Sequence, residues 1–387
     1  MPRRSTGSPL ADAAAATRLA ACLPTVRKSF AAALAASVLL LLPGLSCTSP
    51  RVKVERVNEP LETATDFPLH TEHWSEPKIF QLRRQEGLDR VAQGARDDLD
   101  LFLRLGSWTR AQWPVGDPEP YPPCNGVDIL AAIRSGRTGG FCGQYCYLLA
   151  DALKSMGYFS VRYLELENPG GDSHFALEAW SNQHDRWVVL DPTYNVHYMD
   201  SSGRPLNAMD LHEAYLSRRI RDVLPVEGVP PPRDGKRIES LPERGIDFYA
   251  NLAFSTRSDL AHLQAPLTMT DRERMFVRYD DPRGGNFKHM KFALATRRIA
   301  DLYPAVAQVD AQIEKIDGET VLVDFSTRGS LPHFLAYQVR LDRGAWRRCG
   351  PRVEWAVPAG VHLLEVSAVN AAGVVGPVFG LRATRSS

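Results

Sequence analysis

The sequence predicts a mixed α+β molecule, with helices and an antiparallel strand hairpin in its first half and a small all-β sandwich at its end. Three observations predict this arrangement. Apolar residues recur with helical spacing between 84 and 156, runs typical of strands follow between 159 and 190, and short β-rich runs alternate with turn residues from about 306. At 387 residues the chain is long enough for two or three structural units.

Composition and charge exclude several classes of protein. The chain is 44% hydrophobic and 24% charged, which is ordinary for a globular protein and argues against a disordered or fibrous one. The formal net charge is +1, so no long-range field attracts nucleic acid or an acidic surface. We therefore expect no nucleic-acid partner.

Residues 1–46 are expected to be a signal peptide rather than part of the fold. Its charged residues are five basic ones and a single acid, Asp12. The apolar run 31–42 is too short to span a membrane, which takes about 20 residues. Small residues precede Cys47, so cleavage before Cys47 is expected. The pattern predicts export to the cell envelope or the extracellular space. It leaves open whether Cys47 is lipidated as a membrane anchor or the protein is released.

The main domain is expected at 81–305, after a proline-punctuated linker at 47–80. Helical periodicity covers 84–113, a short helix is expected at about 126–135, and a third helix begins at Cys142. The apolar positions of this third helix form the stripe of a helix that packs on a core.

Three strands are expected to follow, at about 159–166, 173–181 and 186–190. A four-residue turn between the last two strands pairs Ala176 with Asp191, which makes Asp191 a diagonal neighbour of His174. Phe175, Leu177 and Ala179, which alternate along the strand, are assigned to the core face. His174 and Asp191 are therefore predicted side by side on the other, non-core face.

Cys142 is expected at a helix N-terminus, where unpaired backbone N–H groups and the positive end of the helix dipole favour a thiolate. Gly139 and Gly140 carry no side chains, so backbone and substrate can come close to the thiol. Together with His174 and Asp191, this predicts a nucleophile, a base and an orienting carboxylate. The backbone N–H of Cys142 is the expected first oxyanion donor. Candidates for a second donor are Trp108, Trp113 and Gln144.

The rest of the chain is read more coarsely. Residues 195–305 form a mixed region with helical stretches expected near 208–222 and 286–303. Residues 306–387 are expected to form the sandwich. The strand-like run 335–341, together with Trp346, Trp355 and the glycine-bounded run 360–373, resembles a fibronectin type III-like or immunoglobulin-like module.

Of the six cysteines, Cys22 and Cys47 belong to the leader or its end, and the four that remain are far too sparse for a disulfide scaffold. A bridge between Cys124 and Cys349 is left open, and Cys146 is expected to be a small buried hydrophobe. No paired CxxC or HxxxH spacing occurs, so we expect no metal site, and nothing in the sequence calls for a cofactor.

The strings around the three candidate residues resemble the transglutaminase-like superfamily. Gly140-Phe141-Cys142-Gly143-Gln144-Tyr145-Cys146 is similar to its nucleophile helix, His174 followed by Glu178-Ala179-Trp180 to its histidine strand, and Trp187-Val188-Val189-Leu190-Asp191-Pro192-Thr193 to its aspartate strand. The resemblance covers roughly 85–200. One departure is Phe175, because many members have a tryptophan soon after the histidine.

The resemblance implies a papain-like α+β core with the nucleophile helix packed on an antiparallel sheet. It implies a cysteine peptidase, amidase or transglutaminase-like acyltransferase that acts on peptide, isopeptide or amide bonds through a thioester on Cys142. The implied partner is a protein or peptide substrate. The expected export signal adds polymers of the cell wall or surface to the candidate substrates.

The superfamily also contains inactive relatives, so the alternative is a non-catalytic envelope protein whose enzyme fold and sandwich bind a glycan or a protein. Structural readings of single residues remain open as well. Asp191 before Pro192 could be only a turn former. Trp180 and Trp187, paired across the hairpin, could be core, cleft wall or a stacking surface. Trp346 and Trp355 are expected in the sandwich core, with a sugar-binding platform as the alternative.

Overall fold

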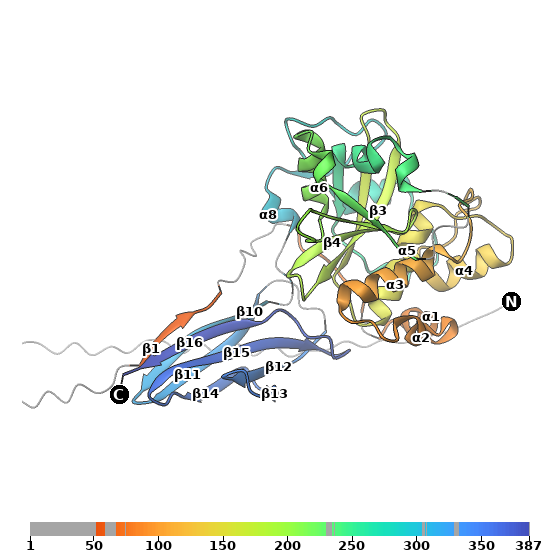
Figure 1. Ribbon diagram of the computed structural model, residues 1–387. Helices are drawn as coiled ribbons and strands as arrows, with labels where there is room; N and C mark the ends of the chain where they lie inside the picture. Colours follow the sequence, from red (N-terminus) through yellow and green to blue (C-terminus); the bar gives the residue numbers. More distant parts are fainter. Residues whose placement is uncertain are drawn as a thin grey trace, which may run out of the picture. The chain divides into compact units, whose positions relative to one another are not determined.

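The structure is a computed structural model that describes residues 52–58, 67–73, 75–229, 234–235, 237–303, 306, 308–328 and 333–386 (Figure 1). The expected signal peptide, the predicted cleavage or lipidation site at Cys47 and much of the expected linker lie outside these residues. Among the described residues, no helix is both long enough and apolar enough to cross a membrane.

The described chain is a mixed α+β structure, as predicted. Its helices are α1 (Pro77–Glu86), α2 (Leu88–Ala92), α3 (Asp98–Arg110), α4 (Gly126–Arg134), α5 (Cys142–Ser155), α6 (Ala208–Leu216), α7 (Met269–Met275) and α8 (Ile299–Leu302), with 3₁₀ turns η1 (Ile220–Asp222), η2 (Ile238–Ser240) and η3 (Pro242–Ala250).

Eight strands form the sheet that carries the candidate site, in the order β6-β5-β4-β3-β2-β7-β8-β9. These strands are β2 (Val161–Glu167), β3 (Ser173–Ser181), β4 (Arg186–Asp191), β5 (Val196–Met199), β6 (Leu224–Glu227), β7 (Asn251–Ser255), β8 (Phe276–Tyr279) and β9 (Leu294–Thr296). All neighbours pair antiparallel except β8 and β9, which are parallel. The three strands predicted from the sequence are therefore the centre of a wider sheet.

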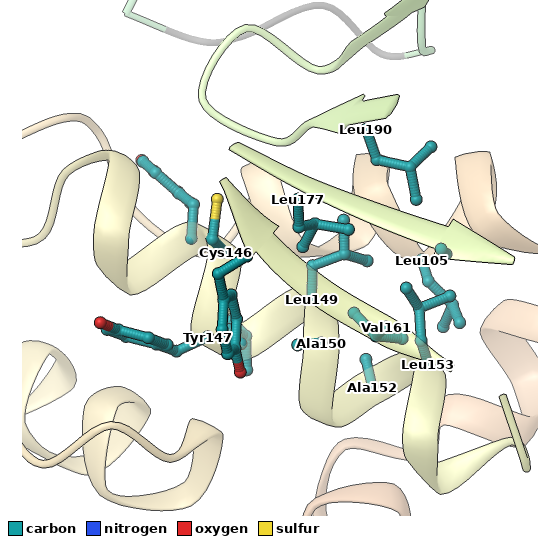
Figure 2. Close-up of a cluster of buried hydrophobic side chains, with 14 of the residues drawn as sticks. Leu105, Cys146, Tyr147, Leu149, Ala150, Ala152, Leu153, Val161, Leu177 and Leu190 are labelled. Carbon is teal, nitrogen blue, oxygen red and sulfur yellow. The ribbon is translucent and has the colours of Figure 1, made fainter. Parts of the chain in front are cut away.

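Helix α5 packs on one face of this sheet. Its apolar residues recur every three or four positions and are almost completely buried, so the stripe predicted from the sequence is the side that faces the core. Figure 2 shows Leu149 and Leu153 of α5 in one cluster with Val161 and Leu177 of the sheet. Leu105 from α3 joins the same cluster, so α5 lies between the sheet and a second layer of helix.

The opposite face of the sheet is also buried, and the prediction of a non-core face is wrong. Ala176 and Val189, which point to that face, are fully buried in a second apolar cluster. Residues of α6, η2, η3 and α8 contribute to this cluster, together with further strands of the sheet. The error has a physical reason. The sequence pattern identified one apolar face of the hairpin, but residues from much later in the chain form a layer that also covers the other face.

Glu178 shows how such a polar residue is buried. It is fully enclosed, and one carboxylate oxygen accepts hydrogen bonds from Arg162 (Nε–Oε2 2.8 Å). The other oxygen accepts from the backbone N–H of Ala208 (2.6 Å) and the hydroxyl of Tyr303 (2.9 Å). Glu178 therefore fastens the start of α6 to the sheet, and its charge is compensated by Arg162.

Three helical predictions need correction. The stretch 84–113 is not continuous, because Gly87 adopts a left-handed conformation (φ 61°) that ends α1, and Asp97 begins α3 by accepting a hydrogen bond from the N–H of Asp100 (2.7 Å). The stretch 286–303 is mostly irregular, with helix only in α8. There the backbone N–H of Lys288 donates to Glu167 (2.6 Å) instead of to a helical carbonyl.

Residues 208–222 are helical only over α6 and the short turn η1, so the helix expected there is also shorter than predicted.

The all-β region consists of two antiparallel sheets that share one apolar core. The sheets have the orders β1-β16-β15-β12-β13 and β10-β11-β14. Their strands are β1 (Val52–Arg56), β10 (Gln308–Asp317), β11 (Thr320–Arg328), β12 (Phe334–Leu341), β13 (Arg347–Cys349), β14 (Arg352–Ala356), β15 (Gly360–Asn370) and β16 (Phe379–Arg385). β1 lies in the stretch expected as a linker, and it pairs antiparallel with β16.

The two tryptophans expected in the sandwich core differ. Trp355 is buried in the core, as predicted. Trp346 is only half-buried, and the guanidinium of Arg340 lies 4.6 Å from its ring centroid. The expectation of a core position is therefore wrong for Trp346, because it follows the exposed turn after β12 and packs against a charged side chain.

The four described cysteines, at positions 124, 142, 146 and 349, are all free. A bridge between Cys124 and Cys349 is therefore not formed. Cys124 is enclosed in the core around α5, and Cys349 lies on β13. Cys146 is fully buried, as expected of a small hydrophobe.

Candidate active site

Cys142 is the first residue of α5, as predicted from the sequence. The preceding residue, Phe141, is extended, and its backbone N–H donates to Oε1 of Gln144 (3.1 Å). This contact satisfies one of the donors that a helix start leaves unpaired, and it ties the Gln144 side chain to the first turn. The thiol thus sits on a rigid helix end rather than on a loop.

The two glycines before Cys142 let two stretches of backbone meet. A Cβ on Gly139 would lie 2.4 Å from the carbonyl oxygen of Asp117, and one on Gly140 would lie 2.6 Å from Nε1 of Trp113. The N–H of Gly139 donates to Asp117 (2.9 Å), and the indole N–H of Trp113 donates to the Gly140 carbonyl (3.1 Å). The prediction of close backbone approach is confirmed, and the loop after α3 is what approaches.

The predicted hairpin register is confirmed. Trp180 lies opposite Trp187 and Leu177 opposite Leu190, which places Asp191 diagonally from His174. The side chains bridge that diagonal, with Nε2 of His174 2.7 Å from Oδ2 of Asp191. Both residues are buried. The sequence therefore located this pair correctly, although it assigned the pair to an open face.

Asp191 makes two sets of contacts, so the alternative that it is only a turn former is wrong. Its Oδ1 accepts hydrogen bonds from the backbone N–H groups of Thr193 (3.0 Å) and Tyr194 (3.4 Å). Its Oδ2 is the oxygen that engages His174. Because the turn holds one oxygen, the other is fixed in position for the imidazole.

The surroundings of His174 set its protonation. Burial disfavours the charged imidazolium, but the charge and hydrogen bond of Asp191, with a further contribution from Cys142, outweigh burial and raise the pKa of His174 to about 10. The rings of Phe248 and Tyr194 lie against the imidazole, with centroids 4.9 Å and 5.7 Å away. Asp191 holds Nε2, so Nδ1 is the ring nitrogen left for the thiol.

Cys142 and His174 line the same cavity, which has a volume of about 300 Å³. Of the three candidates for a second oxyanion donor, Gln144 lines this cavity, whereas Trp108 and Trp113 are not among the described residues around it. The indole N–H of Trp113 is already used by Gly140. The structure therefore retains Gln144 alone of the three.

Two charged residues of the cavity were missed by the sequence analysis. Glu165 from β2 and Arg272 from α7 both line it and form an ion pair. For Glu165 a signal existed, because a carboxylate in the run FSVRYLEL of a buried strand needs a partner. For Arg272 there was none, since nothing local links α7 to β2.

Arg110 holds the elements of the site together. Its Nε donates to the carbonyl of Thr193 (2.7 Å), just after Asp191, and its Nη1 donates to the hydroxyl of Tyr145 on α5 (3.0 Å). Nη2 pairs with Asp234. This buried guanidinium therefore links α3, α5 and the turn that follows Asp191.

The sequence matches no model of a known protein family, and a search of curated proteins found no significant relative. Taken by geometry, the arrangement has a thiol at a helix start, an imidazole beside it and a carboxylate behind the imidazole. Such an arrangement can form and break an acyl–sulfur bond. The resemblance to the transglutaminase-like superfamily stays a prediction.

Proposed function

We propose that this protein is a thiol enzyme that transfers or hydrolyses acyl groups through a thioester on Cys142. One observation carries the proposal: His174 lines a cavity with Cys142 while its Nε2 is held 2.7 Å from Asp191. The three groups come from the start of α5, the start of β3 and the end of β4. That order fits a papain-like, transglutaminase-like core, which we propose as the finer fold assignment.

In the proposed reaction, the sulfur of Cys142 attacks the carbonyl carbon of a peptide, isopeptide or amide bond. The backbone N–H of Cys142 stabilises the oxyanion, and Gln144 is the second donor. His174 gives its proton to the leaving amine, and the C–N bond breaks to leave a thioester. Water or an amine then attacks the thioester, gives a proton back to His174 and releases the thiolate.

The raised pKa of His174 supports this division of roles. Because Asp191 keeps the imidazole protonated through neutral pH, the proton needed by the leaving group is in place before the attack. The second apolar cluster behind β3 supports it as well, since it walls the pair off from bulk water. We extend the proposal to location: the basic, apolar N-terminal segment points to an exported enzyme.

The test is alkylation of Cys142 by iodoacetamide at neutral pH, followed by peptide mass spectrometry. We expect Cys142 to react at least about tenfold faster than glutathione, because an imidazolium stabilises its thiolate. His174→Ala should remove the excess rate, whereas Cys349→Ser, a matched change at the other half-buried cysteine, should leave it unchanged.

A Cys142 that reacts no faster than glutathione would overturn the proposal and favour the alternative of a non-catalytic binding protein. A second measurement identifies the chemistry. The intact protein is incubated with an activated ester or a peptide mixture, and the mass of any acyl group left on Cys142 is recorded. Cys142→Ser should retain no thioester.

A further inference from the structure

The cavity that holds Cys142 and His174 also holds an ion pair that the proposed mechanism does not use. Nε of Arg272 donates to Oε1 of Glu165 (2.6 Å), and Nη2 of Arg272 engages the same oxygen. The Arg272 guanidinium carbon lies 5.5 Å from the ring centroid of Phe175, the residue next to His174. A charged group is thus fixed on the wall of the site by two contacts.

The two partners are unequally exposed. Glu165 is 1% exposed, whereas the side chain of Arg272 is 27% exposed. Glu165 therefore anchors the guanidinium from behind, and Arg272 is the member of the pair that a ligand can reach. The anchor occupies the edge formed by Nε and one N–H of Nη2, so among the described contacts both N–H groups of Nη1 and the second N–H of Nη2 are left for a ligand.

The charge of the pair favours an anion. Burial raises the pKa of Glu165 to about 7, although Arg272 and then His174 act to lower it. At neutral pH the carboxyl is therefore partly protonated, while the guanidinium stays charged. The pair then presents a partial positive charge on the wall of the cavity.

We propose that Arg272 binds a carboxylate of the acyl donor and so selects substrates that carry one beside the bond attacked by Cys142. This inference rests on the proposed function and names its substrate class. A cavity of about 300 Å³ is at the small end for a ligand site, so it accepts the reacting group and little more than one residue. The carboxylate must therefore lie close to the reacting carbonyl, either as a free chain end or as an acidic side chain.

Two alkylating reagents of nearly the same size test the inference. Iodoacetate and iodoacetamide both lose iodide to a thiolate, and they differ in carrying a carboxylate or a neutral amide. The ratio of their rates at Cys142 reports carboxylate binding, because the thiolate fraction cancels. We expect this ratio to exceed that of glutathione by about tenfold, the effect of one charged hydrogen-bonded contact.

Arg272→Gln should lower the ratio about tenfold, and any excess over glutathione left in this variant is due to the His174 imidazolium, which the variant keeps. Arg272→Lys should leave it intermediate, because lysine keeps the charge but not the planar fork. The matched control is Arg274→Gln, which removes the same charge from an exposed position of α7 and should leave the ratio unchanged. If Arg272→Gln does not fold because Glu165 loses its partner, the double variant Glu165→Gln/Arg272→Gln carries the same test.

A ratio that is the same in the wild type and Arg272→Gln overturns the inference and leaves the ion pair as a tether for α7. The proposed function is judged separately, from the absolute iodoacetamide rate, so each can fail alone. Two capped ligands then separate the sources of the carboxylate. N-acetylglycine offers a chain-end carboxylate and N-acetylglutamate α-amide a side-chain one. The ligand that carries the recognised kind of carboxylate should occupy the cavity and slow alkylation of Cys142 in the wild type. It should not slow alkylation in Arg272→Gln.

Discussion

Two buried histidine–aspartate pairs can be compared within the described chain. In the first, Nε2 of His174 lies 2.7 Å from Asp191, and the thiol of Cys142 is the next neighbour. In the second, Nε2 of His212 lies 3.2 Å from Asp281, and Nδ1 of His212 lies 2.7 Å from the carbonyl oxygen of Tyr249. Both histidines are nearly inaccessible to solvent.

The difference is in the group at the remaining ring nitrogen. A carbonyl oxygen can only accept, so the second pair clamps α6 to η3 and offers no path for a proton. A thiol can give up a proton, so the first pair can take part in a reaction. A histidine–aspartate contact is thus not evidence for catalysis by itself, and the third group decides.

Removing each histidine should separate the two pairs most strongly. We expect His174→Ala to slow acylation of Cys142 by an activated ester at least about 100-fold, because it removes the general acid–base group. We expect His212→Ala to leave that rate nearly unchanged and to lower the free energy of unfolding by about 1–3 kcal/mol, since its buried partners become unsatisfied. The acylation rate is measured by following loss of the activated ester, and the free energy of unfolding is measured by chemical denaturation. Equal loss of activity in both variants would abolish the distinction.

The aspartates should differ in their effect on the pKa of His174. Asp191→Asn removes the charge that outweighs burial, so the pKa of His174 should fall from about 10 by several units, as followed by NMR titration of the imidazole. Asp281→Asn is the matched control and should leave this titration unchanged.

The same shift has a consequence for stability. Because the folded-state pKa of His174 is raised, its contribution is fully present below about pH 6.5 and is lost as the pH rises toward 10, at no more than about 1.4 kcal/mol per pH unit. Asp191→Asn should flatten that alkaline loss. A wild-type stability that does not decline between these pH values would contradict the proposed ion pair.

The smallest effect on stability is expected from replacing Arg283, an exposed residue that donates a hydrogen bond to Asp281. The hydrogen bond from Arg283, opposed by burial and assisted by His212, lowers the pKa of Asp281 to about 2. Its contribution is therefore present above about pH 4 and is lost as the pH falls toward 2. Arg283→Gln should change the stability at neutral pH only slightly, because the guanidinium is exposed to solvent, and should shift the midpoint of acid unfolding slightly upward. A loss of Cys142 reactivity would show that the second pair is coupled to the first.

The sequence was sufficient to predict those parts of the fold and site that depend on interactions between residues close together in the chain. The four-residue turn between β3 and β4 fixed the register, and the register fixed the contact of His174 with Asp191. The start of α5 at Cys142 was also predictable, because the glycines before it and the apolar stripe after it mark the boundary.

It was insufficient where partners lie far apart in the chain. Buried Glu178 accepts hydrogen bonds from Arg162, Ala208 and Tyr303. No sequence pattern within β3 predicts these contacts. Arg272 reaches Glu165 across 107 residues for the same reason. Around Lys288 the spacing of apolar residues suggested a helix, but hydrogen bonds from its backbone to side chains elsewhere hold that segment in an irregular path.

The pairing of β1 with β16 makes the sandwich discontinuous along the chain. Asn58 accepts a hydrogen bond from the N–H of Gly380, 322 residues later (2.9 Å). During synthesis, β1 therefore leaves the ribosome long before its partner β16. The eight-stranded sheet, whose strands lie between the two in the chain, can form before β16 is made. Until β16 is synthesised, β1 has no native partner and is a free strand that can pair with another chain. A fragment cut at residue 306 would give the same problem in reverse, with β16 as an exposed edge. A fragment designed to contain the sandwich should therefore also include β1, Val52–Arg56.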